Sequence, residues 1–251
     1  MSYMDAYRDH LKRIGATGRD REINLIKRDL SRLAPNSAAY KKISVDGKEQ
    51  HVIMRSTDNY YTKELICMPG EHVAMGSLVD FVDAKWIVTE RDFDDEIYGK
   101  SKMKMCNATL KWKAKDGTVY SYEGYADDAT KYSEGTEGTR YLRVGEFQLK
   151  VFIPMDEITS QIYRDMRFII DADKYVPSLI AVGDTPYVFR VTRRNIVTGT
   201  YRGEGYVEIT LVEDSFIAGK DDAENMLAAQ QWELKELEQT EPGEQDEGGW
   251  L

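Results

Sequence analysis

The stretch KWIVTERDFDDEIYGKSKMKMCNATLKW, Lys85 to Trp112, predicts two β-strands on either side of an acidic elbow. Each flank carries a tryptophan, and apolar side chains alternate with polar ones, a period of two that is typical of half-buried strands. The elbow holds DFDDE, Asp92 to Glu96. Either this acid group is a metal or catalytic site, or it is the solvated turn of a β-hairpin.

The spacing of the acids favours the turn. A calcium loop of the helix-loop-helix type needs Gly at its sixth position and Glu at its twelfth. Counted from Asp92, these positions hold Ile97 and Met103. We therefore expect an elbow without a bound metal.

Other chemical motifs are equally weak. The three histidines show no paired metal-ligand spacing; they are His10, His51 and His72. The segment SEGTEGTR lacks the lysine of a phosphate-binding loop. No cofactor is expected, and the sequence predicts a protein that is not an enzyme.

Strand-like segments rich in Val, Ile, Tyr, Phe and Thr recur about every ten residues from Tyr40 to Glu213. Asp46 and Gly47 lie between two alternating runs and predict a tight hairpin. The one candidate helix in this region is MDEITSQIYRD. The pattern predicts a mainly β fold of small antiparallel β-barrel or sandwich domains.

A weak repeat suggests that one β unit occurs twice. Aligning Thr89 with Thr192 places Trp86 opposite Phe189 and Val88 opposite Val191, and pairs the later strands at Thr109, Leu110, Thr210 and Leu211. The downstream elbow lacks the acids of the first. This again favours a structural elbow. The repeat itself has two explanations: the chain contains two related β domains, or two short strand patterns are similar by chance.

Helices are predicted at the N-terminal end of the sequence. One apolar stripe at three- and four-residue steps comprises Ile23, Ile26, Leu30 and Leu33. A shorter helix precedes it and ends at Gly15, and Pro35 ends the second. The opposite face is basic, which fits either a solvated face or docking to an acidic partner.

These features divide the chain into four segments. They are an N-terminal helical segment (1–36), a first β domain with a long loop at 124–141 (40–158), a second β domain (159–216) and an acidic tail (217–251). Within the tail, residues 221–239 are expected to form a helix, and the residues after it are expected to be disordered.

Charge and cysteine content narrow the function. The net charge is −10. Ten acidic and two basic residues from Gly219 onward give −8 for the tail and leave −2 for the rest. Tight phosphate binding needs clustered Lys and Arg, so a dedicated nucleic-acid module is disfavoured.

Cys67 and Cys106 match no paired spacing and predict buried, reduced thiols of an intracellular protein. No apolar run is long enough for a membrane helix.

The cluster of Trp86, Cys106, Asn107 and Trp112 resembles a family of structural virion proteins of tailed phages of Gram-positive bacteria. The shared pattern is a Trp-[IL]-V-T strand, an acidic elbow ending in Tyr, and then Met-x-x-Cys-Asn-x-x-Leu-x-Trp; the later RFIID, YVFRVTRRN and GEGYVEITLVED also resemble the family. The resemblance covers roughly Met54 to Asp222.

This resemblance implies a non-enzymatic neck protein of the head-tail connector or head-closure type. It would form a homo-oligomeric ring, 12- or 6-fold, around the DNA channel. Its partners would be a portal or adaptor above and a tail terminator or tail tube below, with transient, non-specific proximity to phage DNA and no membrane. The protein would be assembled in the host bacterial cytoplasm and reside in the virion.

The residues assigned to this role are architectural. The predicted core comprises Trp86, Val88, Cys106, Asn107, Leu110, Trp112, Phe189, Val191 and Leu211. The candidate interface or channel loop comprises Asp127, Asp128, Lys131, Glu134, Glu137 and Arg140. Two alternatives remain: a tail or baseplate component, and a β-rich module that binds carbohydrate or peptide through exposed tyrosines.

Overall fold

The computed structural model describes all residues except 1–2, 16, 95, 130–146, 171–185 and 235–251. Antiparallel strands predominate in the described part and form two barrel-like sheets, which confirms the predicted fold class. The chain divides into two compact units. Unit 1 comprises Met1–Cys106, Phe152–Met155 and Ile196–Val207; unit 2 comprises Asn107–Val151, Asp156–Asn195 and Glu208–Leu251.

Unit 1 begins with two helices, α1 (Tyr3–Ile14) and α2 (Gly18–Leu33), followed by the short 3₁₀ helix η1 (Ala34–Asn36). A reciprocal capping box starts α2: the Thr17 hydroxyl accepts from Asp20 N, and the Asp20 carboxylate accepts from Thr17 N. The predicted helices are present, but no residue of α2 is buried. Its apolar stripe therefore lacks a partner in the described part of this chain.

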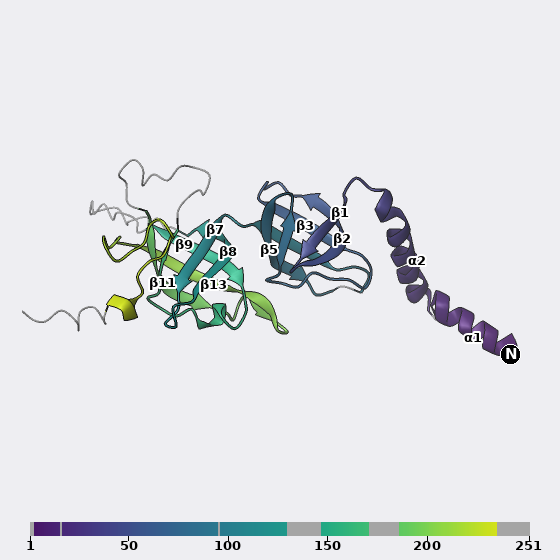
Figure 1. The fold of residues 1–251 in the computed structure, drawn as a ribbon. Helices are drawn as coiled ribbons and strands as arrows, with labels where there is room; N and C mark the ends of the chain where they lie inside the picture. The colour runs from purple at the N-terminus through teal and green to yellow at the C-terminus, as the bar shows by residue number, and fades with distance from the viewer. Residues whose placement is uncertain (1–2, 16, 95, 130–146, 171–185, 235–251) are drawn as a thin grey trace, which may run out of the picture. The chain divides into compact units, whose positions relative to one another are not determined.

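The rest of unit 1 is mainly a closed six-stranded barrel in the order β1-β2-β3-β6-β5-β4 (Figure 1). Its strands are β1 (Tyr40–Val45), β2 (Lys48–Ser56), β3 (Thr62–Cys67), β4 (Leu78–Phe81), β5 (Ala84–Asp92) and β6 (Lys100–Met105). The ladder between β1 and β4 closes it, with Ser44 opposite Asp80 and Val45 opposite Val79. Closure pairs both edges of the sheet within the chain.

Alternation along the strands fills the barrel. Its core includes Ile43, Val52, Leu65, Val79, Trp86, Val88 and Met103. The predicted hairpin at Asp46 and Gly47 joins β1 to β2, and both residues have positive φ values of 48° and 79°. This is the backbone geometry that two-residue turns between antiparallel strands require.

The second sheet is ordered β10-β11-β13-β9-β8-β7, with β12 paired to β13, and most of it belongs to unit 2. Its strands are β7 (Ala108–Lys113), β8 (Val119–Asp128), β9 (Gln148–Pro154), β10 (Arg167–Ile169), β11 (Val188–Asn195), β12 (Thr200–Tyr201) and β13 (Glu204–Asp214). Strand β12, the end of β9 and the start of β13 belong to unit 1. The two end strands, β10 and β7, also lie close to each other, and the ring centroids of Phe168 and Trp112 are 5.9 Å apart. The sheet is curved accordingly.

The strand pairing differs from the expected domain boundary at 158/159. Strands β7, β8 and β9 belong to the second sheet, not to the first domain. Only Cys106 and Asn107 separate β6 from β7, so the sequence shows no linker there. Asn107 instead begins the new sheet, because its side-chain amide donates to Ala126 O at 2.9 Å and accepts from Ala126 N at 2.6 Å.

The repeat also needs correction. The strand β7, with Thr109 and Leu110, is not the counterpart of β13; that place belongs to β6. Both β5–β6 and β11–β13 are antiparallel pairs with a register shift at the aligned threonines, Thr89 and Thr192. The equivalent units are therefore β4-β5-β6 and β10-β11-β13. Strand patterns alone could not distinguish β6 from β7, because both alternate and follow the same elbow.

Two segments that were predicted as helices are mostly not helical in the structure. The segment MDEITSQIYRD contains only the 3₁₀ turn η2 (Thr159–Gln161). The tail forms turns and an isolated bridge between Asp222 and Leu227, and is helical only at 231–234 within the described residues. The side chain of Asp221 accepts bonds from Ile217 N and Ala229 N, and these bonds favour a folded-back chain over a helix.

Candidate functional site

The candidate site lies beside Trp112, at the end of β7. Its indole is 5% exposed and lies 5.5 Å, between ring centroids, from both Tyr120 and Tyr122. Phe168 of β10 contacts it edge-on. Residues 112, 120 and 122 come together because β7 and β8 pair with Trp112 opposite Tyr120. The sheet thus supplies a rigid aromatic wall.

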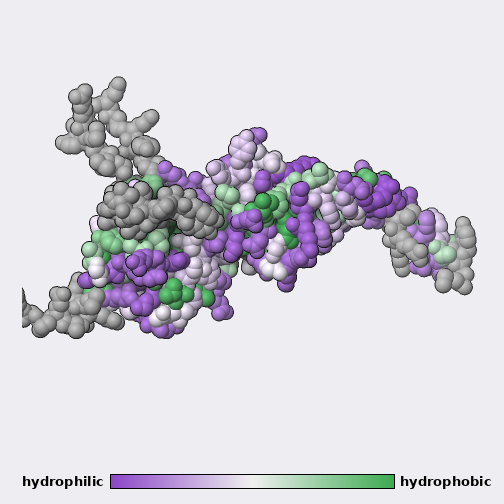
Figure 2. All heavy atoms as spheres, turned by 45° about the horizontal axis from the view of Figure 1, so that its top comes forward, coloured by the Kyte–Doolittle hydropathy of each residue, from purple (hydrophilic) through white to green (hydrophobic). Residues whose placement is uncertain are grey.

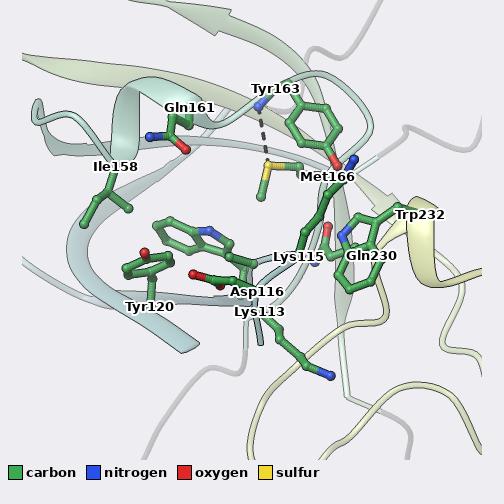
Figure 3. Close-up of a pocket in the computed structure, with 12 residues that line it drawn as sticks. Lys113, Lys115, Asp116, Tyr120, Ile158, Gln161, Tyr163, Met166, Gln230 and Trp232 are labelled. Carbon is green, nitrogen blue, oxygen red and sulfur yellow. Dashed lines mark hydrogen bonds between the residues drawn. The ribbon is translucent and has the colours of Figure 1, made fainter. Parts of the chain in front are cut away.

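A cavity of about 410 Å³ opens against this wall (Figure 3). Its aromatic lining comprises Trp112, Tyr120, Tyr163 and Trp232; its polar lining includes Lys113, Lys115, Asp116, Gln161 and Gln230. The side chains come from β7, the turn after it, β8, the segment around η2 and the C-terminal segment. A cavity of this volume falls within the range of about 300–1,000 Å³ that small-molecule sites occupy.

The polar side chains at the rim differ in protonation and in their partners. The Asp116 carboxylate accepts a bond from Thr118 N at 2.9 Å, and this bond lowers the pKa of Asp116. Burial raises the pKa of Tyr163, which keeps its hydroxyl protonated at neutral pH. Lys113 Nζ lies 3.4 Å from Glu233 Oε1. The rim therefore offers an ionised acceptor and a neutral hydroxyl.

One wall of the cavity is held by a buried amide. Gln230, 1% exposed, donates from Nε2 to Arg167 O at 2.8 Å and accepts at Oε1 from Arg167 N at 3.2 Å. It thereby takes the place of a strand partner at the edge of β10. This contact positions the C-terminal segment and, with it, Trp232.

The Arg167 side chain reinforces the same attachment. Its guanidinium, 3% exposed, bonds to both carboxylate oxygens of Asp221 at 2.9 and 3.0 Å and to Asp214 at 3.0 Å. It also donates to the carbonyl oxygens of Ser215 and Ala229 at 2.7 and 3.0 Å. A buried charge with this many partners is a well-satisfied network.

A second polar cluster belongs to unit 1. Glu204 accepts two bonds from Arg91 Nη1, at 2.5 and 2.6 Å, and one from Met75 N at 3.3 Å. Burial raises the pKa of Glu204, but the bonds from Arg91 and Met75 outweigh it and leave the pKa lowered. Nearby, a Cβ on Gly76 would lie 1.7 Å from Gly205 O, so the two backbones touch. This cluster fastens segment 196–207 within unit 1.

The structure places the predicted core residues in two groups. Trp86 and Val88 lie in the barrel core, whereas Leu110, Trp112, Phe189, Val191 and Leu211 are buried in unit 2. The assignment of Asn107 to the core was wrong: it is exposed, because its side-chain amide bonds to the Ala126 backbone. Cys67 is buried and its pKa is raised to about 11 by burial. Cys106 is only half-buried, because it lies in the two-residue connection between β6 and β7; no disulfide joins the two thiols.

The acidic elbow joins β5 to β6. Asp92 accepts a bond from Asp94 N at 3.0 Å, and Glu96 accepts one from Arg19 Nη1 at 2.7 Å. Within the part of the chain that the structure describes, no three His, Cys, Asp or Glu side chains are grouped so that they could hold a metal ion. Asp92 therefore shapes the turn, and Glu96 contacts α2 through Arg19.

The predicted interface loop is only partly described. Asp127 and Asp128 are exposed at the end of β8. Lys131, Glu134, Glu137 and Arg140 lie outside the described residues. Among the described helices, none is long and apolar enough to cross a membrane.

Sequence reasoning assigned Trp112 to the core and predicted no pocket. Tyr120 could have been found from its two-residue spacing to Tyr122 in VYSYEGY. Tyr163 and Trp232 carry no local signal, because only the folding of η2 and of the C-terminal segment onto the sheet brings them to Trp112.

The fold and the pocket define a two-unit antiparallel β protein with an N-terminal helical segment. Residues 5–105 match the family model of the YomX N-terminal domain. YomX-like names belong to proteins of Bacillus SPbeta-like phages, and the match is consistent with a phage origin. It covers α1, α2 and the barrel.

Among curated proteins, no match is found. Among solved structures, the chain is similar to MrkH of K. pneumonia. The complex of MrkH with c-di-GMP is 9% identical, with a TM-score of 0.26 over 76% of this chain and 85% of that chain. MrkH in its apo state is 7% identical, with a TM-score of 0.26 over 76% and 84%. Scores of this size carry no functional weight.

Proposed function

We propose that this chain is a non-enzymatic structural protein of a tailed-phage virion, a neck subunit of the head-tail connector or head-closure type. In this role it forms a 12- or 6-fold ring around the DNA channel between the portal or adaptor and the tail. It assembles in the host cytoplasm and acts through contacts, not catalysis. The match to the YomX N-terminal domain supports the phage origin.

The observation that carries the assembly role is the unpartnered helix α2. Leu25 and Leu33 are 47% and 56% exposed, and no residue of the helix is buried. Figure 2 shows apolar side chains among the polar ones on the N-terminal helices. A helix of this length is marginal in water unless an apolar face packs against a partner. The capping box defines the helix start, and the missing packing calls for another chain.

A second copy of this chain has complementary charge. Residues 1–34 carry eight basic and five acidic side chains, net +3, whereas residues from Gly219 onward carry net −8. Docking of α2 on the acidic C-terminal segment of the next copy joins two different surfaces. Such a heterologous contact closes into a ring when the rotation between copies allows it. The acidic balance also suits a channel through which DNA slides.

The test is the oligomeric state of the full chain and its position in the particle. Light scattering and electron microscopy of the purified protein are expected to show 6- or 12-fold rings. The double change Leu25→Glu and Leu33→Glu is expected to give monomers, whereas Tyr60→Glu, at an 87% exposed barrel position, leaves the rings intact.

A wild-type protein that stays monomeric at all concentrations would overturn the assembly role. Labelled antibody that marks the tail or baseplate of the virion instead of the neck would overturn the neck assignment. That result would leave assembly in place and support a tail or baseplate component.

A further inference from the structure

The pocket beside Trp112 combines flat apolar surfaces with polar groups at the rim. Tyr120 and Tyr163, the latter 46% exposed, present their rings to the pocket (Figure 3), and Trp112, 5% exposed, lies behind them. Aromatic rings present large, rigid apolar faces at low entropic cost. A ligand for this surface must itself have a flat or gently puckered apolar face.

The rim sets the second requirement. The ionised Asp116 carboxylate is an acceptor, the Gln161 amide is both donor and acceptor, and the Tyr163 hydroxyl stays protonated. These groups pair with hydroxyls, each of which donates and accepts. A ligand with several neighbouring hydroxyls satisfies them at once.

The charge balance around the pocket favours a neutral ligand over a strongly charged one. Lys113 lies against Glu233, and Lys115 is adjacent in sequence to Asp116. The four charges sum to zero, so the surroundings of the pocket carry no net positive charge that favours a phosphate group. This favours a neutral ligand over a nucleotide, which would need unpaired cations.

We propose that this pocket is a binding site for a neutral pyranose sugar. The ring face lies on Tyr163 and Tyr120, with the largely buried Trp112 behind them, and the hydroxyls bond to Asp116 and Gln161. The cavity of about 410 Å³ has room for one or two such rings. The site lies within unit 2 and does not depend on ring assembly, so it gives the subunit a recognition function in addition to a structural one.

The experiment titrates the full chain with four sugars, glucose, galactose, N-acetylglucosamine and N-acetylgalactosamine. Saturation-transfer NMR detects the bound sugar, and tryptophan fluorescence, to which Trp112 and Trp232 contribute among four tryptophans, follows the change at the pocket. We expect at least one sugar to bind with Kd of about 1 mM, as befits a small ligand.

Variants locate the site. Tyr163→Ala and Gln161→Ala are each expected to weaken binding about tenfold or more, whereas Tyr60→Ala, an exposed tyrosine of unit 1, leaves it unchanged. Circular dichroism checks that each variant is folded. Trp112 is not varied, because it is part of the core of unit 2.

Three outcomes overturn the proposal. They are the absence of binding by all four sugars up to about 20 mM, well above the Kd expected for such a ligand; equal binding by the Tyr163 and Gln161 variants; and tighter binding of guanosine monophosphate or of a short apolar peptide at the same residues. Because rings are measured separately, failure here leaves the assembly role standing.

Discussion

The barrel and the second sheet contain the same three-stranded unit but protect its edge differently. In the barrel, β4 of the unit β4-β5-β6 pairs with β1, and backbone hydrogen bonds close the sheet. In the second sheet, β10 of the unit β10-β11-β13 has no further strand in the sheet order. Side chains cover it instead: the Gln230 amide bonds to the Arg167 backbone, and the Arg167 guanidinium holds the C-terminal segment.

This difference teaches that an exposed strand edge can be closed by a few well-placed polar side chains. It also explains why a pocket forms in unit 2. Because the C-terminal segment is attached at β10 and not paired as a strand, Trp232 is left beside Trp112, and a cavity remains between the segment and the sheet.

The substitution Arg167→Met should have the largest effect on the attachment that covers the edge of β10. The change leaves the buried Asp221 carboxylate and Asp214 without their cation. Removing one partner of a buried ion pair costs about 3–5 kcal/mol. We expect urea denaturation to show this loss for unit 2 only.

The matched control is Arg190→Met on the neighbouring strand β11, whose pair with Asp165 is 43% and 32% exposed. A surface pair contributes about 0–1 kcal/mol. If the two variants lose the same free energy of unfolding, the attachment at Arg167 is not what closes this edge.

Gln230→Ala removes only the amide that replaces a strand. Arg167 N loses the hydrogen bond that it donates to Gln230 Oε1, and Arg167 O loses the one that it accepts from Gln230 Nε2. Leaving buried backbone groups unpaired costs about 1–3 kcal/mol. Hydrogen exchange should accelerate at Arg167 N, while the barrel amides stay protected; Gln161→Ala, an exposed glutamine, serves as the control and should change neither.

Thr89 and Thr192 occupy equivalent positions in the two three-stranded units, but their hydroxyls differ in hydrogen bonding. Within the described residues, Thr89 Oγ1 is buried without a hydrogen-bond partner, whereas Thr192 Oγ1 donates to Thr210 O at 3.2 Å. Thr89→Val removes an unpaired hydroxyl and should leave stability unchanged or raise it by up to about 1 kcal/mol. Thr192→Val should lower it by about 1 kcal/mol. Thermal unfolding of both variants measures the contrast, and the same sign for both would contradict it.

The smallest change in stability is expected when the pH is lowered and Glu204 becomes protonated. The pKa of Glu204 is lowered in the folded state, so its contribution to stability is present above the unfolded value of about 4.5 and is lost as pH falls below it. Because Glu204 is partly exposed, the loss should be below about 1 kcal/mol. Hydrogen exchange of segment 196–207 at pH 7 and pH 4 measures it, and Glu204→Gln should abolish the difference.

Several features could be predicted from the sequence because they depend on local chemistry. The hairpin at Asp46 and Gly47, the helix end at Gly15 and the mainly β class follow from turn residues and periodicity. The domain boundary could not be predicted, because β6 and β7 look alike and only two residues separate them. The pocket was not predicted: Trp112 was assigned to the core, which its burial confirms, and Tyr163 and Trp232 were assigned no role.

By itself, the sequence determined that the chain folds into small antiparallel sheets with a helical start and an acidic end. These features follow from alternation, turn residues and charge, which depend on residues close together in the sequence. Only the tertiary structure decided which strands share a sheet, how the edge of β10 is covered and which aromatic rings meet at Trp112. These depend on contacts between residues far apart in the chain, such as Arg167 with Asp221 and Gln230. Local patterns contain no information about such pairs, because many partners satisfy the same pattern.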